Sequence, residues 1–220
     1  MLLIRPFLAF SEVRHPVGHC TAFIQVLNGR INKRAVLSFT TAVLLASPAA
    51  FAATYDIDSV HSKVLFNVEH LGFSKMYGLF EDYSGTFDFD ATKPNAGALT
   101  VKIGTASIKT NNALRDSHLA GPDWFNAKQF PEMTFVGKKF EKLGTKDGVI
   151  NGELTILGTT RPVTMQVSFN KEGVNPLDKN YYAGFSAHTE IKRSDFGMKT
   201  YLGAIGDDVE IIIQVEGRKQ

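Results

Sequence analysis

From Tyr55 to the C-terminus, apolar and polar residues alternate with a period of two, and turn-forming residues separate the runs. The run 86–90 shows this clearly, because Phe87 and Phe89 fall on the face opposite to its polar residues. Such alternation is typical of strands that bury one face. The runs predicted as strands are 63–70, 86–90, 99–104, 133–140, 149–157, 163–169, 183–191 and 209–215.

Two segments break the alternation. Residues 72–79 are predicted as a short connector. In the longer segment 111–130, Asn112 is a candidate N-cap and Gly121-Pro122 a stop signal, so 112–120 are predicted as a short helix. Strands and helices do not alternate along the chain, so a parallel sheet is not expected. The fold expected is all-β, an eight-stranded antiparallel barrel with a short helical cap, since closure removes exposed sheet edges.

The N-terminal part has a different pattern. Lys33-Arg34 precede the apolar run 35–46, and the triplet Ala50-Phe51-Ala52 follows. A positive region, a short apolar region and an A-x-A site are typical of a secretory signal peptide, and the run is too short for a bilayer core of ~30 Å. We expect 1–52 to be a leader and signal peptide cleaved near Ala52, and 53–220 to be the exported barrel domain.

Charge gives no case for nucleic acid as a partner. The leader holds five of the 24 basic and one of the 22 acidic residues, which leaves 19 and 21 in 53–220, a mildly acidic domain. Cys20, the one cysteine, also lies in the leader. Disulfides, thiol catalysis and thiolate metal sites are therefore excluded for the exported domain.

Catalytic and metal-binding patterns are equally weak. His61, His70, His118 and His188 include no pair at the i, i+4 spacing of a helical zinc site, and neither a nucleophile elbow nor a phosphate-binding glycine loop occurs. The pair Arg115-Asp116 with His118 could support acid–base chemistry, although holding a cap through charge-assisted bonds is the simpler interpretation. We predict a protein that is no enzyme and needs no metal or cofactor.

Twelve of the 17 Phe residues lie in 53–220, where they recur at strand spacing and indicate a very apolar interior. A packed core and an apolar ligand cavity both fit this composition. The candidate lumen residues are Phe66, Val68, Phe87, Phe89, Val101, Phe135, Leu154, Ile156, Met165, Phe185 and Ile211. Each of them could instead belong to ordinary core or to the outer face.

Several motifs carry a family resemblance. They include Ile57-Asp58-Ser59-Val60-His61-Ser62, Ser107-Ile108-Lys109-Thr110, Arg115-Asp116-Ser117-His118-Leu119, Asp123-Trp124-Phe125 and Arg193-Ser194-Asp195-Phe196-Gly197. With these motifs in order, residues 55–217 resemble the YceI-like family of bacterial periplasmic lipid-binding proteins. The resemblance implies an extended lipocalin-like barrel whose lumen holds a polyisoprenoid or similar amphiphile, and a carrier role in the periplasm. It also implies links to isoprenoid quinone metabolism or stress responses.

For the polar end of such a ligand we expect His70, Arg115, Asp116 and Arg193 to serve, while Trp124 and Phe125 either gate access or form a structural cap. Transient membrane contact for loading and a homodimer stay open. Two rival functions also remain: an enzyme acting on a small apolar or lipid substrate at the barrel mouth, and a scaffold whose barrel binds no ligand.

Overall fold

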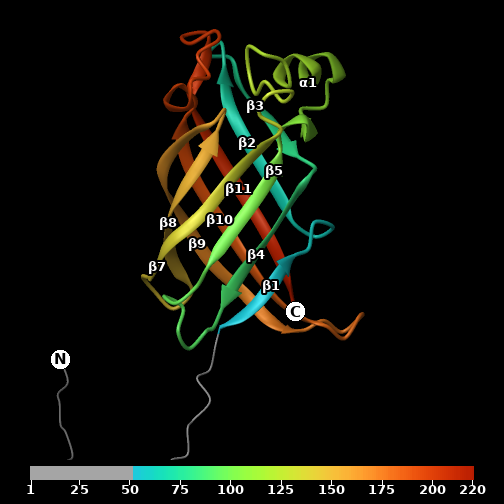
Figure 1. Ribbon diagram of the computed structural model, residues 1–220, viewed down its shortest axis with the longest axis vertical. Helices are drawn as coiled ribbons and strands as arrows, with labels where there is room; N and C mark the ends of the chain where they lie inside the picture. Colours follow the sequence, from blue (N-terminus) through green and yellow to red (C-terminus); the bar gives the residue numbers. More distant parts are fainter. Residues whose placement is uncertain (1–51) are drawn as a thin grey trace, which may run out of the picture. The chain divides into compact units, whose positions relative to one another are not determined.

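A computed structural model describes residues 52–220, so the predicted leader and signal peptide lie outside the described residues except for Ala52. The described part is a closed antiparallel β-barrel of eight strands with a short helix at one end (Figure 1). The barrel predicted from the alternation is thus confirmed.

The ring of the barrel joins strands that are mostly consecutive in the chain. Its order is β1 (Ala53–Ile57), β4 (Tyr83–Phe89), β5 (Leu99–Gly104), β7 (Glu132–Lys142), β8 (Asp147–Ile156), β9 (Thr159–Val174), β10 (Tyr181–Lys192) and β11 (Ile205–Lys219). The end of β11 pairs with β1, placing Lys219 opposite Tyr55, and this closes the ring. Closure leaves these strands without a free edge over the paired region.

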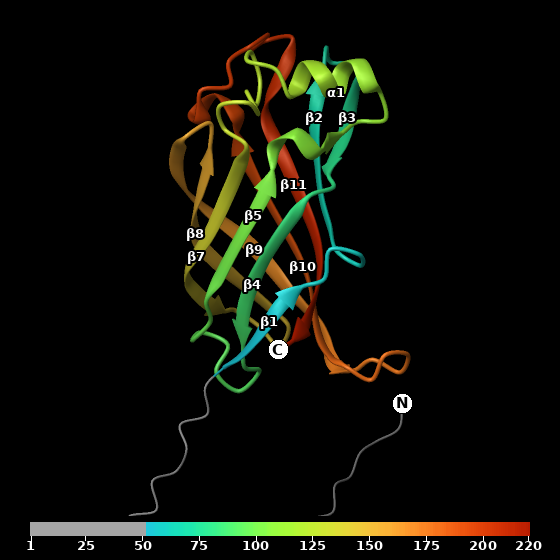
Figure 2. The same cartoon turned by 45° about the vertical axis from the view of Figure 1, so that its right-hand side comes forward.

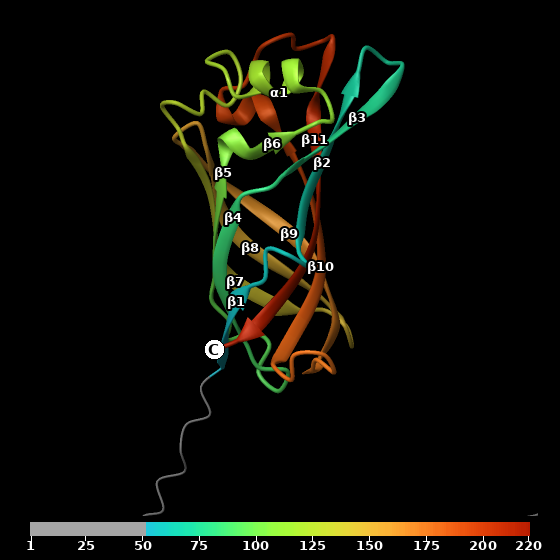
Figure 3. The same ribbon diagram turned by 90° about the vertical axis from the view of Figure 1, so that its right-hand side faces the viewer.

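The rest of the same β11 edge is occupied by β2 (Lys63–His70), which continues into β3 (Ser74–Phe80) and the two-residue β6 (Ile108–Lys109). The β2–β3 hairpin leans away from the barrel wall at one end (Figure 3). The connector predicted over 72–79 was wrong, because most of it forms β3. This strand is exposed over its first half, so its sequence lacks the apolar alternation that marks a half-buried strand.

The short helix α1 (Ala113–Leu119) confirms the prediction for 112–120. The side chain of Asn112 accepts a hydrogen bond of 2.9 Å from the Arg115 N–H and caps the helix. The 3₁₀ turn η1 (Thr105–Ser107) follows β5, and η2 (Arg193–Phe196) follows β10. The helix and the loop after η2 occupy the same end of the barrel, called here the cap end (Figure 2). The opposite end, with the β7–β8 and β9–β10 turns, is called the hairpin end.

Candidate functional site

A cavity of about 530 Å³ occupies the inside of the barrel. Every strand from β1 to β11 contributes to its wall, because alternate residues of a strand point to opposite faces of a sheet. Its volume lies within the range of roughly 300–1,000 Å³ that small-molecule sites occupy. The lining runs from Phe125 and Met198 at the cap end to Lys146 in the β7–β8 turn, so the cavity follows the long axis of the barrel.

All eleven candidate lumen residues lie in this wall. They are Phe66 and Val68 on β2, Phe87 and Phe89 on β4, Val101 on β5, Phe135 on β7, Leu154 and Ile156 on β8, Met165 on β9, Phe185 on β10 and Ile211 on β11. The period-two alternation identified the inner face of each strand, because neighbouring residues of a strand point to opposite faces of the sheet.

Glycines make room for several of the aromatic rings. A Cβ added to Gly78 on β3 would come within 2.3 Å of the Phe66 ring, and one added to Gly217 on β11 within 2.4 Å of Phe87. A Cβ added to Gly152 on β8 would come within 2.5 Å of the Phe135 ring. A side chain at any of these three glycines would therefore occupy the space that the neighbouring ring fills.

Two hydroxyl groups in the wall of the cavity are bonded to backbone. Ser62 and Thr189 line the cavity, and the Ser62 hydroxyl donates to the Glu216 carbonyl at 3.3 Å and accepts from the Glu216 N–H at 3.0 Å. The Thr189 hydroxyl donates to the Thr164 carbonyl at 2.8 Å. Both hydroxyl groups are thus engaged by backbone, and most of the other lining residues are apolar, which suits a hydrocarbon ligand.

The hairpin end of the cavity is aromatic. Phe89 lies 5.4 Å from Phe169 and 5.0 Å from Phe185 between ring centroids, and Phe87 lies 5.5 Å from Phe185. Phe87 also stacks on Tyr55 at 5.1 Å. Beyond these rings, the β7–β8 turn adds Lys142 and Lys146 to the lining, which the strand pattern did not identify because they flank or lie in a turn.

Arg193 brings a buried cation to the cap end. Its side chain is 4% exposed and its three nitrogens donate to the backbone carbonyls of Gly206, Met198 and Ile205 at 2.8, 2.9 and 3.0 Å. The guanidinium also lies 5.3 Å from the centre of the Trp124 ring, a cation–π distance. Burial lowers the pKa of Arg193, which the negative charge of Asp207 opposes, and a guanidinium stays charged at neutral pH.

Trp124 and Phe125 also line the cap end of the cavity. The Phe125 ring meets Phe80 edge-on at 5.5 Å, so it covers the inner end of β3. Phe196 and Met198 join them from the η2 segment. Sequence reasoning missed these last two, because residues in an irregular loop have no periodicity to indicate which way they face.

Arg115 and Asp116 do not line the cavity. Asp116 Oδ1 accepts hydrogen bonds from the N–H and the hydroxyl of Thr110, at 2.8 and 2.6 Å. Arg115 donates from Nε to the Thr110 hydroxyl at 2.7 Å and from Nη2 to its carbonyl at 2.6 Å. The hydroxyl of Thr110 is the main cause that lowers the pKa of Asp116. These bonds tie α1 to the end of β6.

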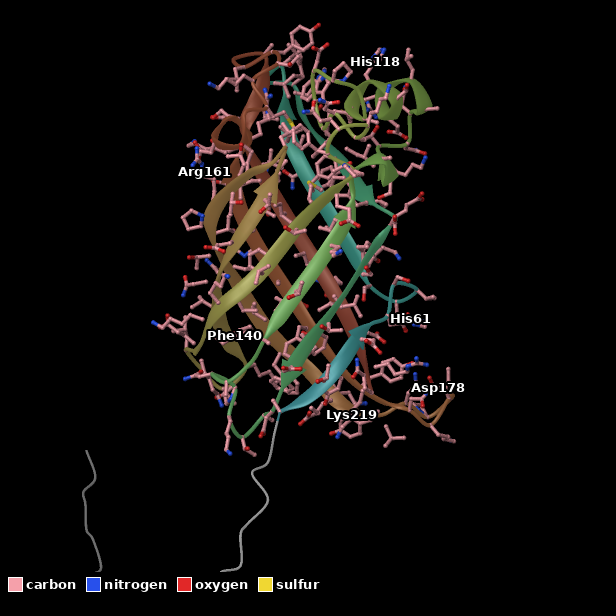
Figure 4. All side chains as sticks on the ribbon, viewed as in Figure 1. His61, His118, Phe140, Arg161, Asp178 and Lys219 are labelled. Carbon is pink, nitrogen blue, oxygen red and sulfur yellow. The ribbon has the colours of Figure 1, made fainter. Side chains whose placement is uncertain are left out.

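His70 also lies off the cavity wall, at the end of β2 where it pairs with Ser74 and Ile205. His118 is on α1 at the cap end, whereas His61 lies on the side of the barrel (Figure 4). In the part of the chain that the structure describes, no three His, Cys, Asp or Glu side chains gather into a group that could hold a metal ion. Within the same residues, no helix is long and apolar enough to cross a membrane.

Known proteins with similar sequences cover most of this chain. Protein YceI of Escherichia coli is 41% identical over 191 residues, which cover 86% of this chain and 99% of the relative. The UPF0312 protein ECA1782 of Pectobacterium atrosepticum is also 41% identical, over 86% of this chain and 98% of its own length.

Solved structures agree with the sequence relatives. Burkholderia cenocepacia BcnA matches with a TM-score of 0.67 and 27% identity, over 73% of this chain and 98% of that one. A polyisoprenoid binding domain from Saccharophagus degradans shares the fold, with a TM-score of 0.60 and 13% identity over 77% and 99% of the two chains. The YceI-like domain family matches residues 55–217. The chain therefore belongs to the YceI-like family.

Proposed function

We propose that this protein is a carrier that holds a long-chain isoprenoid, or a similar amphiphilic lipid, inside its barrel. The observation that carries the proposal is the apolar cavity of about 530 Å³ along the barrel axis. Each buried CH₂ contributes roughly 0.8 kcal/mol, so a long hydrocarbon chain binds tightly without polar contacts along its length. The fold shared with the Saccharophagus degradans polyisoprenoid binding domain supports this class of ligand.

The polar end of the lipid is proposed to face the cap end, beside Arg193 and Trp124. Arg193 has five N–H groups, and backbone carbonyls account for three of them. Two donors are left for an oxygen-rich head group. His70, Arg115 and Asp116 contribute to this end indirectly, by shaping the β2–β3 and α1 segments around it.

We further propose that the carrier is exported, acts in the periplasm after removal of residues 1–52, and catalyses no reaction. The hydrogen bonds that occupy Arg115 and Asp116 favour a structural role for both over acid–base chemistry. A role in isoprenoid quinone metabolism or in a stress response would follow from the identity of the bound lipid.

Filling the cavity tests the proposal. Ala187 on β10 lines the cavity, and its neighbour His188 is exposed on the outside of the same strand. We expect Ala187→Trp to weaken binding of a radiolabelled long-chain polyprenol at least about tenfold, because the indole takes up lumen space. His188→Trp is the matched control and should bind as the wild type does.

Circular dichroism of both variants checks that the barrel is intact. Equal polyprenol binding by the folded Ala187→Trp variant and the wild type would contradict a ligand in the lumen. Equal loss in both variants would show that the indole acts by some route other than filling the cavity.

A further inference from the structure

Four large apolar side chains are exposed together at the cap end. Leu71 and Phe73 belong to the β2–β3 turn, and Tyr201 and Leu202 to the loop before β11; these four are called here the tip patch. Phe73 is 87% exposed, Tyr201 70%, Leu71 51% and Leu202 42%. Exposed apolar residues that cluster, unlike scattered ones, mark a surface that contacts another apolar phase.

The two segments of the tip patch are joined to each other. The Leu71 N–H donates to the Ala204 carbonyl at 2.8 Å, and His70 pairs with Ile205 in the sheet. Both segments lie at the cap end in two views (Figures 1 and 3). The turn that carries Phe73 and the loop that carries Tyr201 therefore lie side by side.

Tight turns hold the tip patch in place. Leu71 and Gly72 have φ angles of 55° and 72°, and the Phe73 N–H donates to the His70 carbonyl at 3.0 Å. Tyr201 has φ 54° and Gly203 φ 91°. A left-handed conformation is unfavourable for Leu and Tyr, and such residues often occur where function requires a fixed geometry.

The tip patch is also connected to the cavity. The rings of Tyr201 and Trp124 lie 6.4 Å apart between centroids, and the Thr200 hydroxyl donates to the Asp123 carbonyl at 2.7 Å. Trp124 in turn lines the cavity and contacts Arg193. Movement of the loop that carries Tyr201 would therefore also displace Trp124 in the wall of the cavity.

Charges of both signs surround the tip patch: Lys75 and Lys199 belong to its two segments, and the Glu69 carboxylate lies 3.8 Å from where a Cβ on Gly72 would be. Glu69 is also the cross-strand partner of Lys75 in the β2–β3 hairpin. Lys75 lies 3.4 Å from the Glu210 carboxylate and is still 58% exposed in its side chain. The two lysines and the two nearby glutamates offset one another, so the exposed apolar side chains are what the tip patch offers to a bilayer.

We infer that the tip patch is the surface with which the protein docks on a lipid bilayer to load or unload its cargo at the cap end. This inference rests on the proposed carrier function, because a long isoprenoid stays in the membrane until a carrier contacts it. A second copy of the chain fits the patch less well. A stable dimer buries roughly 800 Å² on each partner, far more than four side chains at two turn tips supply.

Vesicle flotation tests the inference with the purified protein. Vesicles of equal parts phosphatidylglycerol and phosphatidylcholine, and vesicles of pure phosphatidylcholine, should both carry the wild type upward in a density gradient. We expect the double change Phe73→Ser with Tyr201→Ser to reduce the bound fraction about tenfold or more, since two large apolar side chains no longer enter the bilayer. Leu177→Ser is the control, because Leu177 is 89% exposed in the turn between β9 and β10, at the hairpin end.

Three results would overturn docking by the tip patch: no flotation of the wild type, equal weakening by Leu177→Ser, or a changed oligomeric state in the double variant with unchanged flotation. Binding of farnesol added directly in buffer separates this inference from the carrier function. If the double variant binds farnesol normally but takes polyprenol from vesicles more slowly, docking is supported. If the wild type floats but binds no farnesol or polyprenol, the carrier function fails while docking stands.

Discussion

The two ends of the barrel are held together by different interactions. At the hairpin end, Phe87, Phe89, Phe169 and Phe185 pack ring against ring inside the wall. At the cap end, ring contacts such as that between Phe80 and Phe125 are joined by hydrogen bonds: Arg193 donates to three backbone carbonyls, and α1 is tied to Thr110. Close packing of many rings fixes the hairpin end, whereas the cap end depends on a few directional hydrogen bonds, so the loss of a single donor such as Arg193 should loosen it.

The hairpin end should matter most for stability. Phe87 is 8% exposed, stacks on Tyr55 and contacts Phe185. We expect Phe87→Ala to lower the free energy of unfolding by about 4 kcal/mol, as removal of a buried Phe usually does. Urea unfolding measures it, with Phe73→Ala at the exposed tip as a control near zero. A loss below about 1 kcal/mol would mean that these rings do not fix this end.

Arg193 should affect both stability and ligand exchange. Arg193→Met keeps the length of the side chain but leaves three buried carbonyls without a donor, so we expect a loss of about 3 kcal/mol in unfolding free energy. Because the cap end is loosened, bound polyprenol should also dissociate faster.

Arg161→Met is the control for Arg193. Arg161 lies on the outer surface with one hydrogen bond, to the Asp195 carbonyl at 3.1 Å (Figure 4). Its loss should change neither measurement. An unchanged dissociation rate in Arg193→Met would place ligand exchange away from the cap end.

The smallest expected effect is a pH dependence at α1. The Thr110 hydroxyl holds the pKa of Asp116 below its ordinary value, so the folded state binds this proton less readily than the unfolded state. The carboxylate therefore stabilises the fold above the ordinary aspartate range of about pH 4, and this contribution is lost as pH falls through the lower, folded-state pKa.

Melting temperatures against pH should show this. The wild type should exceed Asp116→Asn by a constant margin near neutral pH, and the margin should shrink below about pH 4. Asp123→Asn is a suitable comparison, since Asp123 engages Thr200 through its backbone carbonyl. A margin that stays constant into strong acid would contradict a role for the ionised Asp116 side chain.

The regular part of the molecule was predictable from the sequence, because period-two alternation identifies both a strand and its inner face. Phe66, Met165 and Ile211 were assigned to the lumen on this ground, and they line the cavity. The pattern failed at β3, whose first half is exposed and so carries no apolar alternation.

The cap end was harder to predict. Arg115 and Asp116 were expected at the polar mouth, but both turn to Thr110, five and six residues earlier in the chain. Nothing in their spacing indicates this, because the bonds depend on how the irregular segment after β6 folds back. Phe196 and Met198 reach the lumen from another irregular segment, for the same reason.

The most direct test of the carrier function is mass spectrometry of organic extracts from the protein purified natively, beside the Ala187→Trp variant. The account predicts a long-chain isoprenoid in stoichiometric amount from the wild type and little from the variant, whose lumen is filled. A wild-type extract free of lipid, with no uptake after incubation with polyprenols, would contradict it and identify the barrel as a scaffold that binds no ligand.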